Sequence, residues 1–281
     1  MRTLETICEH NDAIKLGRAE SARFVIPAEI ILDKDMNDKR CTAFSYMSMR
    51  RGLDNDILYT VNDMTEWTGR TPNRHKNGIN SKFIESIYEL SDRGYIHTLC
   101  EPNHTSLSKA SIDMDRISSQ CNENRFASVY LDEINRIMEY ENPNPKDSFF
   151  NKDIVLLVFS YLRMMIPRRK NVLLYEENGD IDSRSERYPE AYDCYQNDIA
   201  DELGISQKSI SKAINALKEM NLIYHEELPR IQSDGKWKTQ TTIFCNFYKR
   251  EGSELLADGK EYYMNEIKNK KKKLDKLKRA S

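Results

Sequence analysis

The sequence lacks the long apolar run that a membrane span would need. No stretch of its 281 residues approaches the roughly 20 consecutive apolar residues that cross a bilayer. Its first residues, Met1-Arg2-Thr3-Leu4-Glu5, place an acidic residue where a signal peptide would need a continuous apolar stretch. We therefore expect a cytoplasmic protein with no membrane partner.

Catalytic and metal-binding signatures are lacking as well. The sequence contains no Walker A loop, no G-x-G-x-x-G, no H-E-x-x-H and no G-x-S-x-G. Its five histidines are isolated, and its six cysteines include no C-x-x-C pair. We expect reduced thiols, several of them in the core, and we expect no metal, no cofactor and no enzymatic activity.

The chain has little excess charge of either sign. Its formal net charge is −2, but Lys268–Ser281 holds eight Lys or Arg against one Asp, so the preceding residues are acidic. A strongly basic body would have indicated nucleic-acid binding directly. A prediction of nucleic-acid binding must therefore be based on local sequence motifs. The basic segment reads as a helix, for which phosphate contact and a solvated terminus are both open interpretations.

Residues 195–218 have the pattern of two short helices around a turn. Gly204 follows the first helix, at a position that commonly needs a positive φ, and Ser206 is a good N-cap for the second helix. Each helix has its apolar residues on one face. These residues are Ile199, Ala200 and Leu203 in the first helix and Ile210, Ala213, Ile214 and Leu217 in the second.

The second of these helices carries polar side chains opposite its apolar stripe. Such side chains can hydrogen-bond to base edges or phosphates from the major groove. Residues 222–227 then alternate as a strand, an Asp-Gly turn follows at 234–235, and residues 238–248 are rich in β-forming residues. The predicted DNA contacts are Ser206, Gln207, Lys208, Ser211, Lys212 and Asn215 in the helix, and Lys236 and Lys238 in the hairpin.

Helix, turn, helix and hairpin is the order of a winged helix-turn-helix domain. The run DIADELGISQKSISKAINALKEMNLI resembles the helix-turn-helix and first wing strand of bacterial winged-helix DNA-binding proteins, and the resemblance covers residues 193–249. It implies that this region binds double-stranded DNA. The alternative is a winged helix that binds protein and has a solvated charged face.

The same plan occurs earlier in the chain. Asn62–Gly69 matches the register of Asn197–Gly204, and Phe83, Ile87 and Leu90 repeat the spacing of the later apolar stripe. An apolar helix is expected at 42–49 and a strand at 57–61. The lead-ins also match, because Phe24-Val-Ile-Pro-Ala-Glu-Ile-Ile before the first copy resembles Ser128-Val-Tyr-Leu-Asp-Glu-Ile-Asn before the second.

The two copies differ in the turn between their paired helices. The first copy has a longer, basic turn at Arg70–Gly78, which in a DNA reader would bind phosphates; an ordinary exposed loop is the alternative. The second copy instead has an insertion at 168–193, acidic in its later part, which we expect to face away from DNA. The predicted DNA contacts of the first copy are Arg70, Arg74, Lys76, Asn80 and Lys82.

These patterns predict a helix-rich α+β fold with tandem winged helix-turn-helix domains. We expect the first domain at residues 1–120, the second at 121–258, and a basic C-terminal helix or tail at 259–281. Residues 116–150 contain a strand-like and a helix-like segment rather than a Gly/Ser linker. The two domains should therefore be packed in a fixed relation.

The order of lead-in, apolar helix, short strand and helix-turn-helix resembles that of replication initiators and replisome organisers from plasmids, phages and conjugative elements of low-GC Gram-positive bacteria. The resemblance implies a mobile-element protein that binds double-stranded DNA in replication initiation, partition or transcription control, with replication proteins as further partners. It also allows a homodimer, because many such readers dimerise on palindromic sites. The alternative is an adaptor that binds replication or regulatory proteins instead of DNA, which the acidic body favours.

Overall fold

The computed structural model describes residues 22–52, 55–123, 125–144, 146, 149–166, 191–227, 232–233, 236–237, 242–246, 261 and 263–265. Within them, the fold is helix-rich α+β with small antiparallel sheets, which confirms the predicted class. The predicted insertion up to residue 190, the Asp-Gly turn at 234–235, and most of the predicted basic helix or tail lie outside the described residues.

The described residues divide into two compact units. The larger unit holds residues 22–165 and 197–220, and the smaller unit holds residue 166, residues 191–196 and the described residues from 221 onward. The larger unit contains nearly all of the helices. The smaller unit contains the later strands.

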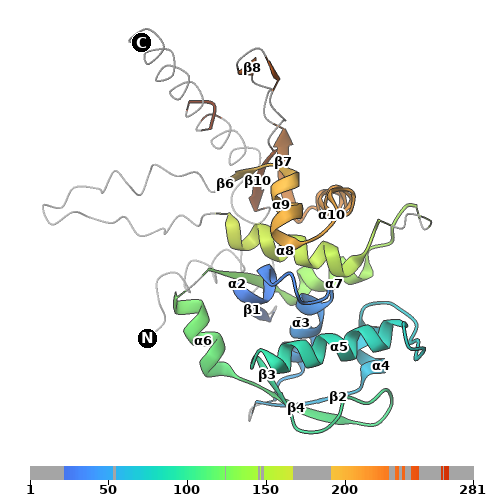
Figure 1. Cartoon of the computed structure of the whole chain (residues 1–281). Helices are drawn as coiled ribbons and strands as arrows, with labels where there is room; N and C mark the ends of the chain where they lie inside the picture. Colours follow the sequence, from blue (N-terminus) through green and yellow to red (C-terminus); the bar gives the residue numbers. More distant parts are fainter. Residues whose placement is uncertain are drawn as a thin grey trace, which may run out of the picture. The chain divides into compact units, whose positions relative to one another are not determined.

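The first copy forms helices and a three-stranded sheet in the order expected from the sequence. Its sheet has the strand order β2-β4-β3, with both pairings antiparallel. Figure 1 shows α3, α4 and α5 gathered with these strands. The elements are β1 (Arg23–Pro27), α2 (Ala28–Leu32), α3 (Arg40–Arg50), β2 (Asp56–Tyr59), α4 (Val61–Trp67), α5 (Ile79–Asp92), β3 (Ile96–Thr98) and β4 (Ser108–Ile112).

The second copy repeats this order along the chain. Its sheet has the order β6-β10-β7, so in both sheets the first strand pairs with the last and the last pairs with the second. A short hairpin, β8 (Gln232–Ser233) with β9 (Lys236–Trp237), lies between β7 and β10 in the sequence. The other elements are β5 (Phe126–Tyr130), α7 (Leu131–Glu139), α8 (Lys152–Met165), β6 (Ala191–Cys194), α9 (Gln196–Leu203), α10 (Gln207–Glu219), β7 (Ile223–Glu227) and β10 (Thr242–Asn246).

The two lead-in strands pair with each other. β1 and β5 are antiparallel, and Val25 lies opposite Ser128 at the centre of the ribbon. Both are the third residue of a five-residue strand that runs directly into a helix, α2 or α7. By place in the strand, Val25 and Ser128 correspond, which shifts the sequence match of the two lead-ins by one residue, and the ribbon has a local two-fold arrangement.

Helix α8 forms the core of the larger unit. All residues from Val155 to Met164 are buried, as expected for a helix that is apolar all round. It contacts α2 and α3 of the first copy as well as α7 and α10 of the second. Arg163, inside this core, makes a 2.8 Å ion pair with Glu133 of α7. The helices of the two copies thus share one core, as the sequence of the joining segment predicts.

Candidate nucleic-acid interface

Helix α10 is fixed by local signals at its start and by burial along its length. Gly204, just after α9, has φ +69°, a conformation that glycine adopts without steric cost. The Ser206 hydroxyl accepts a hydrogen bond from the Ser209 N–H at 3.2 Å and so caps the helix. The apolar stripe formed by Ile210, Ala213, Ile214 and Leu217 is buried. These predictions from the sequence are confirmed.

The opposite face of α10 is polar, and most of it is exposed. The Lys208 ammonium lies 5.0 Å from the centroid of the Phe149 ring, which gives this side chain a cation–π partner. Lys218, which is not among the predicted contacts, is also exposed. The predicted contacts Ser206, Gln207, Lys208, Lys212 and Asn215 are exposed, and Ser211 is half-buried.

The predicted hairpin contacts lie at the limit of what the structure describes. Lys236 belongs to strand β9, which pairs with β8 through Ser233. Its side chain, and the whole of Lys238, lie outside the described part. The role of these two lysines therefore stays a prediction.

Helix α5 of the first copy has a different outer face. Arg74 and Lys76 in the turn before it are exposed, and so is Lys82 on its first turns. Further along, the exposed positions are Glu85, Tyr88 and Asp92. The basic side chains are therefore confined to the turn and the N-terminal end of α5, whereas the rest of the face is acidic or aromatic.

Asn80 does not lie at the surface, which corrects its prediction as a DNA contact. Its side chain is fully buried. The Asn80 Oδ1 accepts the Asn73 backbone N–H at 2.8 Å, and its amide nitrogen donates to Asn62 Oδ1 at 2.8 Å. The same nitrogen lies 3.2 Å from His104 Nδ1. Asn80 thus fastens the long turn to α4 and to the loop between β3 and β4.

Arg70 also has a different role from the predicted phosphate contact. One of its terminal nitrogens lies 2.8 Å from Asp153 Oδ2, and the other donates to Asn151 Oδ1 at 3.1 Å. Asp153, at the start of α8, is completely buried, and its other oxygen accepts a 2.8 Å hydrogen bond from Thr42. Arg70 therefore attaches the long turn of the first copy to α8 of the second copy.

Lys39 completes this buried charge cluster. Its ammonium lies 3.1 Å from Asp153 Oδ2 and 2.9 Å from Asp38 Oδ1. Burial opposes the charged form of Lys39, but Asp153 and Asp38 prevail and raise its pKa above the ordinary value. Neither Asp153 nor Lys39 is among the residues predicted from the sequence. The available signal was a lone carboxylate at the start of a long apolar run, where it needs a buried partner.

In both copies the lead-in helix reaches the C-terminal end of the outer helix, α5 or α10. In the first copy, Arg93 at the end of α5 forms an ion pair with Asp33 at the end of α2. In the second, Arg136 of α7 donates to the backbone carbonyl of Met220 at the end of α10. The orientation of each outer helix is therefore tied to its own lead-in.

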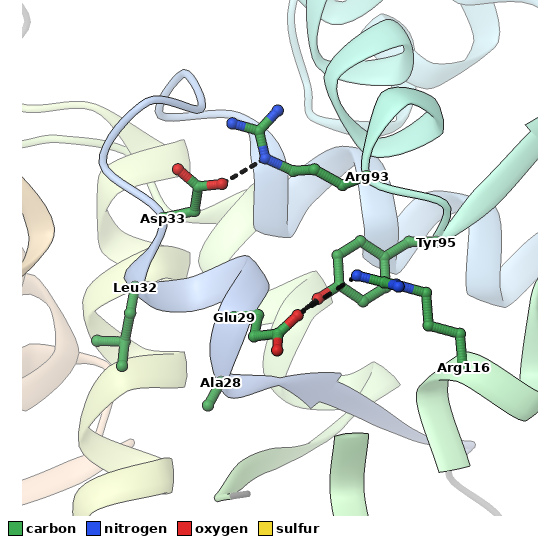
Figure 2. A pocket seen from close by; sticks show the side chains of 7 residues that line it. All are labelled: Ala28, Glu29, Leu32, Asp33, Arg93, Tyr95 and Arg116. Atoms are coloured by element: carbon green, nitrogen blue, oxygen red, sulfur yellow. Dashed lines mark hydrogen bonds and ion pairs between the residues drawn. The ribbon is translucent and has the colours of Figure 1, made fainter. Parts of the chain in front are cut away.

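A pocket of about 460 Å³ lies at the first of these contacts (Figure 2). Tyr95 donates its hydroxyl to Glu29, and the guanidinium of Arg116 lies over the Tyr95 ring at 4.9 Å. The hydrogen bond from Arg93 holds the pKa of Asp33 below its ordinary value. Charged side chains in this pocket face opposite charges, so we interpret it as a structural junction.

Among the described residues, no group of three or more His, Cys, Asp or Glu side chains is placed to hold a metal ion. Nor is any described helix long and apolar enough to cross a membrane. Comparison with protein-family models and with curated proteins gave no match to this chain.

Proposed function

We propose that this protein binds double-stranded DNA through two winged helix-turn-helix domains, and that α10 is its principal reading helix. The observation that carries the proposal is the exposed face of α10, where Gln207, Lys208, Lys212 and Asn215 stand opposite a buried apolar stripe. The repeated element order and the identical strand order of the two sheets support the winged-helix assignment.

In the proposed complex, α10 enters the major groove with its exposed face. Gln207 and Asn215 carry amides that can pair with adenine edges, and Lys208 can reach guanine or phosphate. The first copy contributes phosphate contacts from Arg74, Lys76 and Lys82 at the N-terminal end of α5. Phosphate contacts of this kind set the register on the duplex rather than the sequence.

The shared core gives the proposed site its length. Helices α5 and α10 belong to one compact unit, and both copies pack on α8. Two reading helices held in this way would cover on the order of one to two turns of about 10 bp each. By its resemblance to replication initiators and replisome organisers, we propose a mobile-element role in replication initiation, partition or transcription control.

A salt-titrated binding experiment tests the reading helix. Replacing Lys208 and Lys212 with Ala should flatten the slope of log K against log [salt] by about one unit for each lost phosphate contact, or by less if a lysine contacts a base. Lys109→Ala is the control, because Lys109 is exposed on β4 and pairs with Asp56 instead. An unchanged affinity and slope in the double variant would place the DNA-binding surface elsewhere.

Footprinting tests the contribution of the first copy. Deleting that copy would expose the α8 core, so point variants are the better choice. With Arg74, Lys76 and Lys82 replaced by Ala, we expect the protected region to shorten at one end while the α10 half-site stays protected. Protection of the full region by this triple variant would refute joint reading.

A protein-binding role for the first copy is the second candidate, and its sheet carries the observation. Leu58 and Leu99 lie on either side of Lys109 on the outer face of the sheet and are 55% and 58% exposed. Leu107, two residues before Lys109, is 67% exposed. Clustered apolar side chains on an outer face are typical of protein interaction sites. An unshortened footprint in the triple variant would favour this function for the first copy.

A further inference from the structure

A groove of about 620 Å³ lies within the larger unit, where α4 and α7 end and α8 begins. Three half-buried aromatic side chains line it: Trp67 at the end of α4, Tyr140 after α7, and Phe150 before α8. Its volume lies in the range of about 300–1,000 Å³ that is typical of ligand-binding clefts. Both copies contribute to it, because Trp67 belongs to the first copy and the other two rings belong to the second.

The three rings are held in place by their neighbours. The Trp67 ring lies against the buried Tyr46 ring, with centroids 5.5 Å apart and planes tilted by 54°. Burial raises the pKa of Tyr140 to about 12, so its hydroxyl stays protonated and donates to Glu219 of α10. The rings of Tyr140 and Phe150 are 5.7 Å apart between centroids. Walls that are already ordered lose little side-chain freedom when a ligand binds.

The rim of this groove is acidic. Glu66, Glu139 and Glu141 are exposed along it, and no ion pair to any of them occurs in the part of the chain that the structure describes. The lining cation is Lys152, and its ammonium donates to the carbonyl of Met138 in the wall. Three carboxylates against one ammonium leave an excess of negative charge in the groove.

Aromatic faces beside carboxylates select organic cations. A guanidinium or ammonium group over a ring is attracted to the negative ring face, and the attraction is stronger where water is excluded. The aliphatic stem of an arginine or lysine can pack on the same rings, and a guanidinium can form paired hydrogen bonds with a carboxylate. Nucleic acid is disfavoured here, because its phosphates would face the three glutamates.

We propose that this groove binds a basic segment of a partner protein. An arginine or lysine side chain of the partner lies between the rings, and neighbouring basic side chains face the glutamates of the rim. The complementary charge selects the partner, and the ordered rings supply apolar contact area. This surface includes none of the exposed leucines of the β2-β4-β3 sheet, and its function does not depend on DNA binding.

The test uses the full chain with Trp237→Phe, which leaves Trp67 as its one tryptophan. The probe is a six-residue peptide of alternating arginine and alanine, blocked at both ends, and its control has glutamine in place of arginine. With the arginine peptide we expect saturable heat in titration calorimetry and a saturable change in Trp67 emission. The glutamine peptide should give neither.

Charge variants locate the binding surface. Glu139→Gln/Glu141→Gln should weaken binding of the arginine peptide by about fivefold at low salt, because two ion pairs are lost. Asp35→Asn/Asp115→Asn removes the same charge at exposed positions that do not line the groove, and it should have a much smaller effect.

Two further variants test the rings and the independence from DNA binding. Phe150→Leu keeps an apolar side chain but loses the ring face, and it should weaken binding of the arginine peptide by about two- to fivefold. Lys208→Ala/Lys212→Ala, which tests α10 as the DNA-reading helix, should leave peptide affinity unchanged. The two proposals can therefore fail separately.

Three outcomes would overturn the proposal. One is the absence of a saturable signal from the arginine peptide by both methods. Another is an equal loss of affinity in the groove variant and in its charge-matched control, which would indicate general attraction to an acidic chain. The third is a dimer in sedimentation velocity that dissociates on Glu139→Gln/Glu141→Gln, because the occupant of the groove would then be a second copy of this chain.

Discussion

The two copies begin the turn between their paired helices in the same way and then diverge. Gly69 after α4 and Gly204 after α9 have φ values of +71° and +69°. The second copy then starts α10 within three residues, at Gln207, with the Ser206 cap. The first copy reaches α5 only at Ile79, and no side-chain cap is found at its Gly78 N-cap.

The difference shows what a long turn requires. The short turn of the second copy depends on one glycine and one serine, Gly204 and Ser206, which both lie within the turn itself. The long turn depends on Asn80, which binds it to α4, and on Asp153, which binds it to α8 of the other copy. The reading helix of the second copy is therefore locally specified, whereas that of the first depends on distant partners.

The largest effect is expected from Asp153→Asn. The change leaves Lys39 and Arg70 without their shared buried carboxylate. Removing one partner of a buried ion pair typically costs about 3–5 kcal/mol, and we expect a loss in that range in urea unfolding. Asp35→Asn, at an exposed position close to the same cluster in sequence, serves as the control. A loss below about 1 kcal/mol for Asp153→Asn would mean that the long turn does not depend on the second copy.

A smaller loss is expected from Asn80→Ala. The substitution removes the partner of the Asn73 N–H and of the Asn62 Oδ1. Each buried polar group left unsatisfied costs about 1–3 kcal/mol, unless water replaces the amide. Thermal unfolding measures the loss, and Asn80→Asp tests the geometry, because aspartate keeps the acceptor but loses the donor to Asn62. If both variants are as stable as wild type, the comparison between the two turns loses one of its two supports.

The short turn of the second copy should lose less stability on substitution than the long turn of the first copy. Ser206→Ala removes the cap of α10, which typically costs about 1 kcal/mol, and Ser206→Gly should cost only a few tenths. Ser106→Ala, in the exposed loop between β3 and β4, provides a matched serine substitution. A loss from Ser206→Ala as large as that from Asp153→Asn would show that the short turn is not the more robust of the two.

The same distinction explains what the sequence could predict. The α9–α10 pair, its glycine and its cap follow from neighbouring residues, and all are confirmed. The repeat of the pattern identified α4, α5 and the lead-in strands. Strand β6 was missed, because Ala-Tyr-Asp-Cys has no strong strand pattern and is extended through its pairing with β10.

Helix α6 (Met114–Glu123) was missed despite a local signal. The Asp113 carboxylate accepts the Arg116 N–H at 2.8 Å, which is a cap, but the helix that follows is mostly polar. Asn80, which is buried, and Arg70, which pairs with Asp153, were assigned as DNA contacts from their residue types. Their actual partners are Asn62, His104 and Asp153, and contacts between residues so distant in sequence depend on the folded arrangement of the helices.

The smallest predicted effect concerns acidic pH and the ends of the two outer helices. At the end of α5, Asp33 pairs with Arg93, and this hydrogen bond lowers the pKa of Asp33 in the folded protein. A lowered carboxyl pKa contributes stability above the unfolded value of about 3.9 and loses it as the pH falls through the folded value. At the end of α10, Arg136 binds a backbone carbonyl, which does not titrate in this range. Acid should therefore loosen the end of α5 before that of α10.

Amide hydrogen exchange at pH 6 and pH 3 should show faster opening around Tyr95 than around Leu222 at the lower pH. In Asp33→Asn the difference should be present at pH 6 already and change little with pH. Equal acid sensitivity of the two helix ends in the wild-type chain would show that the Asp33–Arg93 pair does not distinguish them.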